Sequence, residues 1–211
     1  MTVTVLLMVD LQNDFMPGGA LAVPDGDSVV NVANEEMNRS DIVVATQDWH
    51  PPGHGSFASS HPGSAVGDVV TLEGLEQIAW PDHCIANSPG ADFHPELRIE
   101  RIDRVIKKGT DPKIDSYSGF FDNDHRNATD LDDYLASITS NDSSSSRKAS
   151  ITLRVMGLAT DYCVKYTVLD ACKLGYNVTV IQNGCRGVGL APDDVPRAFA
   201  EMKAAGATIE S

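Results

Sequence analysis

Apolar residues recur along the chain in two patterns, short continuous runs and longer stretches with helical spacing. The continuous runs predict strands at residues 2–11, 42–46, 104–108, 151–158 and 177–181, with a last edge strand at 207–210. Apolar residues three and four positions apart predict helices at residues 28–39, 129–138, 161–174 and 192–205. Because strands and helices alternate, we expect an α/β fold with a mostly parallel, doubly wound sheet.

Three segments follow neither pattern. Residues 51–87 are rich in Pro, Gly, Ser and His and predict a long irregular loop, which in a compact domain usually carries function. Residues 115–124 combine turn residues with aromatics, and the polar run 141–150 predicts an exposed loop without chemistry. No repeat or change of composition divides the chain, so its 211 residues predict a single domain over 1–211.

The net charge and the cysteine pattern indicate which binding partners and which cellular compartment to expect. With 16 Lys and Arg against 30 Asp and Glu, the net charge of −14 argues against nucleic acid or an anionic membrane as a partner. The first apolar run, residues 3–9, lacks a basic leader and is too short to cross a bilayer. Cys84, Cys163, Cys172 and Cys185 form no C-x-x-C pair, which indicates reduced thiols and a cytoplasmic protein.

Reactive residues stand where the predicted strands end. Ligands of parallel sheets bind at the carboxyl ends of the strands. The residues at or just after the ends of the first four strands are Asp10, then Asp48 and His50, then Lys108, and finally Ala159 followed by Cys163. Reactive side chains therefore gather at one edge of the expected sheet, which favours an enzyme.

Cys163 is the candidate nucleophile. Thr160 is the expected N-cap of the helix 161–174, which places Cys163 in the first helical turn. The helix dipole and the unpaired N–H groups at that position predict a lowered pKa for the thiol and a reactive thiolate. A small buried thiol without chemistry is the alternative, since many free cysteines are inert.

Asp10 and Lys108 are candidates to assist the thiol. Asp10 could act as a general base, or it could cap the turn that follows its strand. Lys108 could hold Asp10 ionised or stabilise the thiolate, or it could be a solvated lysine at a strand end. Lys107 competes for this place, because strand alternation lets only one of the two lysines face the site.

A second constellation suggests a divalent metal site. Asp48 and His50 are two residues apart in an extended segment and can point to the same side, and His83 follows in the histidine-rich loop. Two imidazoles and one carboxylate suit zinc, iron or manganese. His54 remains open as a ligand, a supporting donor or a bystander, whereas His61 is expected at the surface.

Aromatic residues lie in the loops at the strand ends rather than in the apolar runs. Phe15, Trp80, Tyr117 and Tyr162, with Phe57 as a fifth, could stack on a flat aromatic substrate. Packing onto the core is the alternative, and it is at least equally expected for Phe57.

Long segments of the chain resemble the nicotinamidases of the isochorismatase-like cysteine hydrolase superfamily. The segments are DLQNDFMPGGALAV, TQDWHPPGHGSFA, WPDHC, SPGADFHPEL, KKGTDPKIDSYSGFFDN, GLATDYCVKYTVLDACKLGY, NGCRGV and AFAEMKAAGAT. NSPGADFHPEL and IDSYSGFFDN favour nicotinamidases over the isochorismatase branch, which generally lacks the metal ligands. The resemblance covers nearly the whole chain except the run NDSSSSRKAS.

The resemblance implies a three-layer α/β/α fold and the hydrolysis of nicotinamide to nicotinate and ammonia, with pyrazinamide as a further substrate. Matched to the family's motifs, the catalytic residues are Asp10, Lys108 and Cys163, and the ligands of one divalent metal, most often zinc, are Asp48, His50 and His83. The same match gives Ala159 and Cys163, after a cis bond before the alanine, as the oxyanion hole, and Phe15, Trp80, Tyr117 and Tyr162 as the substrate pocket. His54 matches a position that joins the metal shell only in some members.

Other functions remain open at this point. A metallohydrolase could attack with ion-bound water and use Cys163 only structurally. A binding module could sense a nicotinamide-like ligand without turnover, and a hydrolase of the same superfamily could act on another small amide or an enol ether. The expected partner is a small molecule, and a homo-oligomer is compatible with the sequence.

Overall fold

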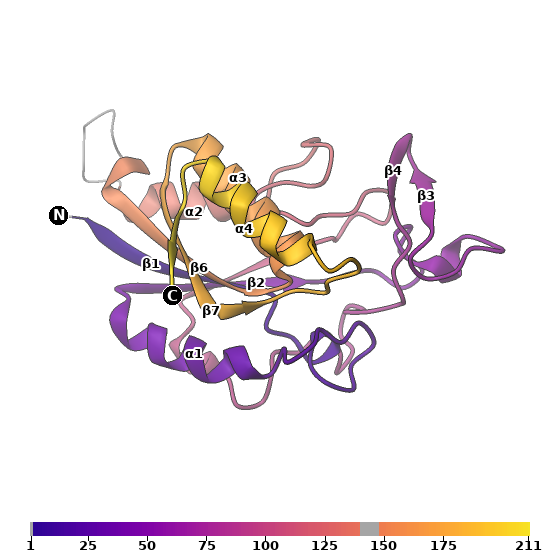
Figure 1. Cartoon of the computed structure of the whole chain (residues 1–211), viewed down its shortest axis with the longest axis horizontal. Coiled ribbons are helices and arrows are strands. Elements are labelled where there is room, and N and C mark those ends of the chain that lie inside the picture. Colours follow the sequence, from indigo (N-terminus) through magenta and orange to yellow (C-terminus); the bar gives the residue numbers. More distant parts are fainter. Residues whose placement is uncertain (1, 140–147) are drawn as a thin grey trace.

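A six-stranded parallel sheet forms the centre of the molecule, described here by a computed structural model for residues 2–139 and 148–211 (Figure 1). Its strands are β1 (Val3–Val9), β2 (Ile42–Asp48), β5 (Arg104–Lys108), β6 (Ile151–Leu158), β7 (Asn177–Arg186) and β8 (Thr208–Glu210). They lie in the order β5-β2-β1-β6-β7-β8, and every neighbouring pair is parallel. The predicted parallel sheet is confirmed.

The strand order reverses between β1 and β6. From β1 the chain first winds outward to β2 and β5, and then returns to β6 and continues through β7 to β8 on the other side. Such a reversal opens a crevice at the carboxyl ends of the two central strands, where doubly wound folds bind their ligands. The two strands approach so closely there that a Cβ on Gly157 would lie 2.2 Å from the Val9 carbonyl oxygen.

Helices cover both faces of the sheet. Helix α1 (Ser28–Glu36), extended by a 3-10 turn at Met37–Arg39, lies on one face, and α2 (Leu131–Ile138), α3 (Lys165–Leu174) and α4 (Asp194–Ala204) lie on the other (Figure 1). Strand β1 is almost completely buried between these layers, as its continuous apolar run predicts. The expected three-layer architecture is therefore confirmed.

The helix after β6 begins differently from the sequence-based expectation. Residues Thr160–Val164 form a π-helical turn before α3 starts, and the Thr160 side chain caps nothing. Its buried hydroxyl has no hydrogen-bond partner among the described residues. The predicted N-cap at Thr160 is wrong, because the chain enters the turn from a buried strand and its first N–H groups are not turned toward that hydroxyl. Cys163 still lies in the first turn after β6.

The segment 51–87 is not wholly irregular. It contains an antiparallel hairpin, β3 (Val69–Leu72) and β4 (Leu75–Ile78), which projects away from the main sheet (Figure 1). Glu73 and Gly74 form its two-residue turn, and both have positive φ. The prediction missed the hairpin, although a two-residue turn ending in glycine between apolar positions is its usual sequence signal.

The predicted exposed loop at 141–150 falls for residues 141–147 outside the described residues, and Lys148–Ser150 form a 3-10 turn. Among the described residues, no helix has the length and apolar character needed to span a membrane.

Candidate functional site

One buried ammonium joins the strand ends on the two sides of the sheet centre. Lys108 Nζ, at the end of β5, lies 2.9 Å from Asp10 Oδ2 and 3.1 Å from Asp48 Oδ1. It donates to the Ser116 carbonyl at 3.0 Å and contacts Cys163 Sγ at 3.5 Å. Lys107 instead points outward over the Trp49 ring, so strand alternation turns Lys108 toward the site.

Asp10 is fixed directly after β1. The Thr46 hydroxyl donates to Asp10 Oδ1 at 2.6 Å and accepts the Asp10 backbone N–H at 3.2 Å. Complete burial raises the pKa of the Asp10 carboxyl, and the nearby Asp48 acts in the same sense, while the Lys108 ammonium partly opposes them. The result is a carboxylate that accepts a proton more readily than an ordinary aspartate does.

The Lys108 ammonium stays charged in spite of its burial. Burial alone would lower its pKa, but the carboxylates of Asp10 and Asp48 together outweigh burial and raise the pKa well above the usual lysine value. Lys108 is therefore a fixed positive charge beside the sulfur, rather than a group that exchanges protons during a reaction.

Cys163 lies in the turn Thr160–Val164 and is 7% exposed. Burial raises the pKa of its thiol well above the ordinary value, and the adjacent Lys108 ammonium only partly offsets this. The expected lowering of the thiol pKa is therefore not found in the resting protein, because burial of the sulfur and the nearby carboxylates outweigh the Lys108 ammonium. A neighbouring base has to remove the thiol proton. Asp10 and Asp48 are both bound to the same ammonium, but only the carboxyl of Asp10 has a raised pKa, which makes it the better proton acceptor.

Asp48, His50 and His83 present a group of ligand atoms within 4.8 Å of one another. His50 Nε2 lies 3.1 Å and His83 Nε2 lies 3.4 Å from Asp48 Oδ2. The opposite ring nitrogens face backbone carbonyls, His50 Nδ1 that of Gly109 at 2.9 Å and His83 Nδ1 that of Pro81 at 2.7 Å. Donation to these carbonyls leaves both Nε2 lone pairs directed toward the carboxylate, an arrangement that fits a divalent metal ion.

Backbone constraints hold this group in place. Gln12 donates to the Asp48 carbonyl at 2.8 Å and accepts the Asp48 N–H at 2.7 Å, so it fixes the end of β2. A Cβ on Gly109, whose φ is +65°, would lie 2.5 Å from the His50 ring, so only glycine leaves room for the imidazole. Neither residue was expected at the site from the sequence, although Gln12 stands in the DLQNDF segment and Gly109 follows Lys108.

His54 lies next to the metal group but is occupied by other partners. Its Nδ1 is 2.8 Å from Ser56 Oγ and its Nε2 is 2.8 Å from the Asp111 carbonyl. Its ring is 4.3 Å from that of His50, and with His50 and Asp115 it forms a second group of nearby ligand atoms. Because both ring nitrogens already have protein partners, His54 acts in this arrangement as a packing and hydrogen-bonding neighbour of His50.

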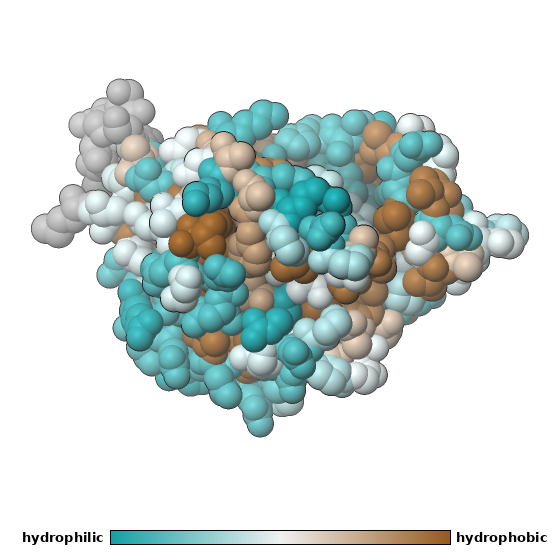
Figure 2. Space-filling view, viewed as in Figure 1, coloured by the Kyte–Doolittle hydropathy of each residue, from teal (hydrophilic) through white to brown (hydrophobic). Residues whose placement is uncertain are grey.

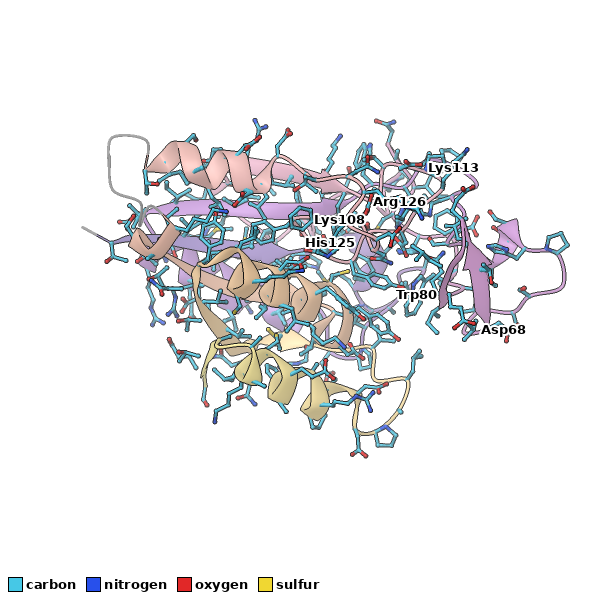
Figure 3. All side chains as sticks on the ribbon, turned by 90° about the horizontal axis from the view of Figure 1, so that it is seen from above. Asp68, Trp80, Lys108, Lys113, His125 and Arg126 are labelled. Carbon is cyan, nitrogen blue, oxygen red and sulfur yellow. The ribbon has the colours of Figure 1, made fainter. Side chains whose placement is uncertain are left out.

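A narrow apolar pocket opens over the sulfur. Phe15, Trp80, Tyr117 and Tyr162 all line it, together with Asp48, His83, Ala159 and Cys163, and also with Leu21, Asp115 and Val188, which the sequence analysis did not name. Trp80 Nε1 donates to the Tyr117 hydroxyl at 3.1 Å, and Trp80 meets Tyr162 edge to face. Figure 3 shows Trp80 on the side of the molecule where the hairpin projects.

Phe57 takes a different place from the other aromatics. It is fully buried beneath the metal group, with its ring against those of His50, His54 and His83. It therefore packs onto the core. The peptide bond between Leu158 and Ala159 is cis, as the resemblance implies, and Ala159 lines the pocket together with Cys163.

These groups together suit acyl transfer on a small flat molecule. The pocket is lined by Cys163 and by two of the three grouped metal ligands, Asp48 and His83. Behind this lining, the buried Lys108 ammonium contacts the sulfur and both Asp10 and Asp48. Aromatic walls favour a ring, and the metal group at one side favours a ring that carries a donor atom. Nucleophilic attack by sulfur on a carboxyl derivative of such a ring is the chemistry that uses all of them.

Comparisons with known proteins agree on one family. A family model for the isochorismatase domain matches residues 4–211. A nicotinamidase of Escherichia coli is 54% identical over 208 residues, which are 97% of this chain and 92% of that protein.

Solved structures give the same picture. A nicotinamidase and pyrazinamidase of Acinetobacter baumannii has a TM-score of 0.89 and 39% identity, covering 99% of this chain and 96% of that one. A pyrazinamidase of Pyrococcus horikoshii, solved in complex with zinc, has a TM-score of 0.73 and 36% identity, covering 99% and 98%.

Proposed function

The chain belongs to the isochorismatase domain family, and from this premise we propose that it is a nicotinamidase, which hydrolyses nicotinamide to nicotinate and ammonia. The observation that carries the proposal is the 54% identity to the Escherichia coli nicotinamidase over nearly the full length of both chains. The buried Lys108 ammonium, which contacts both Cys163 and Asp10, supports it, because amide hydrolysis through a thioester uses a nucleophile, a base and a fixed positive charge.

The first step is the activation of the sulfur. Asp10 takes the thiol proton of Cys163, a role supported by the raised pKa of its carboxyl. Lys108, 3.5 Å from the sulfur, stabilises the thiolate that results. Thr46 holds Asp10 in position through the hydrogen bond to Oδ1.

The thiolate then attacks the amide carbon of nicotinamide. The negative charge that develops on the amide oxygen is stabilised by the backbone N–H groups of Ala159 and Cys163, both of which line the pocket. A donor of this kind contributes about 3–4 kcal/mol to a transition state. Asp10 returns its proton to the amide nitrogen, the carbon–nitrogen bond breaks, and ammonia leaves with formation of a thioester.

Water completes the reaction. Asp10, again ionised, takes a proton from a water molecule that attacks the thioester carbon. The carbon–sulfur bond breaks, nicotinate is released and Cys163 recovers its proton. Each bond that forms in the first half breaks in the second, so the enzyme returns to its starting state.

Asp48, His50 and His83 would hold one divalent ion, and zinc is the ion proposed here. The donor set of one carboxylate and two Nε2 atoms supports this choice, as does the zinc complex of the Pyrococcus horikoshii pyrazinamidase. When bound, the ion would supply a Lewis-acidic contact for the pyridine nitrogen and so fix the ring.

The aromatic walls select the ring. Phe15 and Trp80 lie among the pocket walls, and Tyr117 is tied to Trp80 through its hydroxyl. Pyrazinamide differs from nicotinamide by one ring nitrogen and fits the same walls, so we expect it to be hydrolysed as well. The Acinetobacter baumannii relative is named for both activities.

The proposal extends to the organisation of the enzyme. Residues 1–211 are taken as one domain, supported by the single family model that spans residues 4–211. The four cysteines form no disulfide with one another, which supports a reducing, cytoplasmic location.

An ammonia assay with nicotinamide tests the proposal. Wild type should release ammonia, and Cys163→Ala should reduce turnover by about four orders of magnitude. Cys172→Ala is the matched control, because Cys172 lies in α3 outside the pocket, and it should keep wild-type turnover. Wild-type protein that releases no ammonia from nicotinamide would refute the function.

The same assay distinguishes the thioester mechanism from attack by ion-bound water. A metallohydrolase that attacks with ion-bound water would keep its turnover in Cys163→Ala. Mass spectrometry of wild type quenched during turnover should show a nicotinoyl group on the peptide that contains Cys163. Absence of that adduct together with a fully active Cys163→Ala variant would exclude the thioester.

A further inference from the structure

One of the three grouped metal ligands is not held by the sheet. Asp48 is the last residue of β2 and His50 follows it closely, so the central sheet fixes both of them. His83 instead comes from the irregular segment between β4 and the 3-10 turn Ile99–Arg101. A ligand in such a segment needs other contacts that orient it if it is to bind a metal ion tightly.

Cys84, the residue after His83, is held at both of its backbone polar groups. Its φ of +45° lies in the left-handed region, which is uncommon for residues other than glycine. Its carbonyl accepts the His50 N–H at 3.0 Å, and its own N–H donates to Asp14 Oδ2 at 2.7 Å. These two hydrogen bonds stabilise the backbone turn that directs the His83 side chain toward the other ligands.

Asp14 connects several segments around the metal group. It is half-buried, its Oδ1 accepts the Ala20 N–H at 3.3 Å, and its own N–H donates to the Gly90 carbonyl at 3.0 Å. A Cβ on Gly90 would collide with the Asp14 carboxylate, so glycine at this position leaves room for it. Phe15, the residue after Asp14, meets the His83 ring edge to face at 5.6 Å, which places this turn directly against the metal group.

We propose that Asp14 is a positioning residue of the metal group, because its carboxylate holds the Cys84 N–H and thereby orients the His83 imidazole. The inference rests on the metal site of the proposed function and adds to it a residue beyond the three ligands. Among the described residues, Asp14 is neither a wall of the catalytic pocket nor a member of the grouped ligand atoms. Asp14 therefore acts through the backbone of Cys84 and not by contact with the ion or the substrate.

The affinity for zinc measures this role directly. Zinc-loaded wild type and variants are titrated with a chromophoric chelator to obtain the Kd, and circular dichroism checks that each variant is folded. Asp14→Ala removes the acceptor of the Cys84 N–H, so the Kd for zinc should rise by about tenfold. Asp14→Asn keeps an oxygen that can accept this N–H, and its Kd should stay within about threefold of wild type. An equal loss in both variants would contradict a role that depends on the hydrogen bond.

Gly90→Ala tests the same hydrogen bond without a change of charge. The added Cβ should displace the Asp14 carboxylate from the Cys84 N–H and weaken zinc binding by about fivefold. This variant decides the question if Asp14→Ala does not fold. A folded Gly90→Ala variant with the zinc Kd of wild type would count against the proposal.

Asp82→Ala is the matched control for charge. Much of the surface is hydrophilic (Figure 2) and the chain has a net charge of −14, so the loss of any carboxylate could weaken the general attraction for a cation. Asp82 is exposed, directly precedes His83, and accepts the Ser59 hydroxyl. Its removal should leave the zinc Kd within about twofold of wild type, because exposed charges are screened by salt.

A double variant shows whether Asp14 acts through His83. Once His83→Ala has removed the imidazole, Asp14→Ala should weaken zinc binding by less than about twofold further, whereas an independent effect would add in full. The proposal is overturned by an unchanged Kd in Asp14→Ala, by an equal loss in Asp82→Ala, or by the full loss in the His83→Ala background. Wild type that binds no zinc would overturn it as well.

These measurements need no substrate and are independent of turnover. A protein with the expected pattern of Kd values that releases no ammonia from nicotinamide would refute the proposed function and keep the role of Asp14. A protein that hydrolyses nicotinamide but keeps its zinc Kd in Asp14→Ala would refute only the role of Asp14.

Discussion

Two clusters of charged side chains in this molecule differ in how deeply they are buried and in how well their charges are balanced. Arg154, in the middle of β6, donates to Glu36 at 2.7 and 2.9 Å and to Glu210 at 2.8 and 3.0 Å. Arg39 provides a second cation for Glu36 at 2.8 Å. Lys108 is a single ammonium shared between Asp10 and Asp48, with the Cys163 thiol beside it.

The balanced Arg154 cluster suits a role in stability, whereas the unbalanced Lys108 cluster suits a role in the reaction. The Arg154 cluster pairs two guanidinium groups with two carboxylates and ties β6 to α1 and β8, so its charges cancel. The Lys108 cluster keeps one more carboxylate than cations and is more deeply buried. Excess negative charge in a dry site is costly for stability, and it supplies a base and a place for a divalent cation.

Replacing the shared ammonium should have the largest effect. In Lys108→Met, Asp10 and Asp48 lose their common cation, so the pKa of each carboxyl rises and the thiolate loses its partner. We expect ammonia release from nicotinamide to fall about 10³-fold and the free energy of unfolding in urea to fall by about 3 kcal/mol.

Two further variants test whether the expected effect of Lys108→Met arises from the shared ammonium. Lys107→Met, on the outward face of the same strand, should keep activity within about twofold of wild type. Lys108→Met/Asp10→Asn should recover stability but not turnover, because it removes the unpaired carboxylate and the base together. Recovery of turnover in the double variant would contradict the division of roles.

Removal of the metal should have the next largest effect. Treatment with a chelator should lower ammonia release about 100-fold, and zinc should restore it. His83→Ala should reduce the bound metal found by elemental analysis, since His83 Nε2 is one of the three grouped ligand atoms. A fully active protein that contains no metal would show that this group has no part in turnover.

Acid should switch off the activity before it unfolds the protein. The pKa of Asp10 lies above the ordinary aspartate value because burial and Asp48 outweigh the pull of Lys108. As the pH falls through this raised pKa, the base becomes protonated and kcat/KM should drop about tenfold per pH unit. Protonation of a carboxyl whose pKa is raised by folding favours the folded state, so this loss should be reversible and should precede the unfolding measured by circular dichroism.

The smallest effect on activity is expected at the balanced cluster. Arg154→Met leaves Glu36 with Arg39 as its remaining cation and frees Glu210 toward solvent. The free energy of unfolding should fall by about 2 kcal/mol while turnover of nicotinamide stays within about twofold of wild type. A larger loss of turnover than of stability would mean that the two clusters are coupled across the sheet.

Local sequence patterns were sufficient to predict most of the helices and strands of the fold. The predicted bounds of β5 and β6 agree with the structure, because short apolar runs next to turn residues have few alternative structures. Strand β7 continues to Arg186, five residues beyond the predicted end at 181, where its pairing with β6 resumes after an irregularity. The hairpin β3–β4 was missed, because its strands are short and largely exposed and give little apolar signal.

The sequence by itself determined which residue types reach the carboxyl edge of the sheet, since each strand carries its reactive residue with it. The resemblance to a family also selected Lys108 over Lys107. Tertiary structure decided the pKa directions of Asp10 and Cys163 and the partners that occupy His54. These properties depend on burial and on groups far apart in the chain. Ionisation responds to every charge within a few ångströms, and only the folded chain sets those distances.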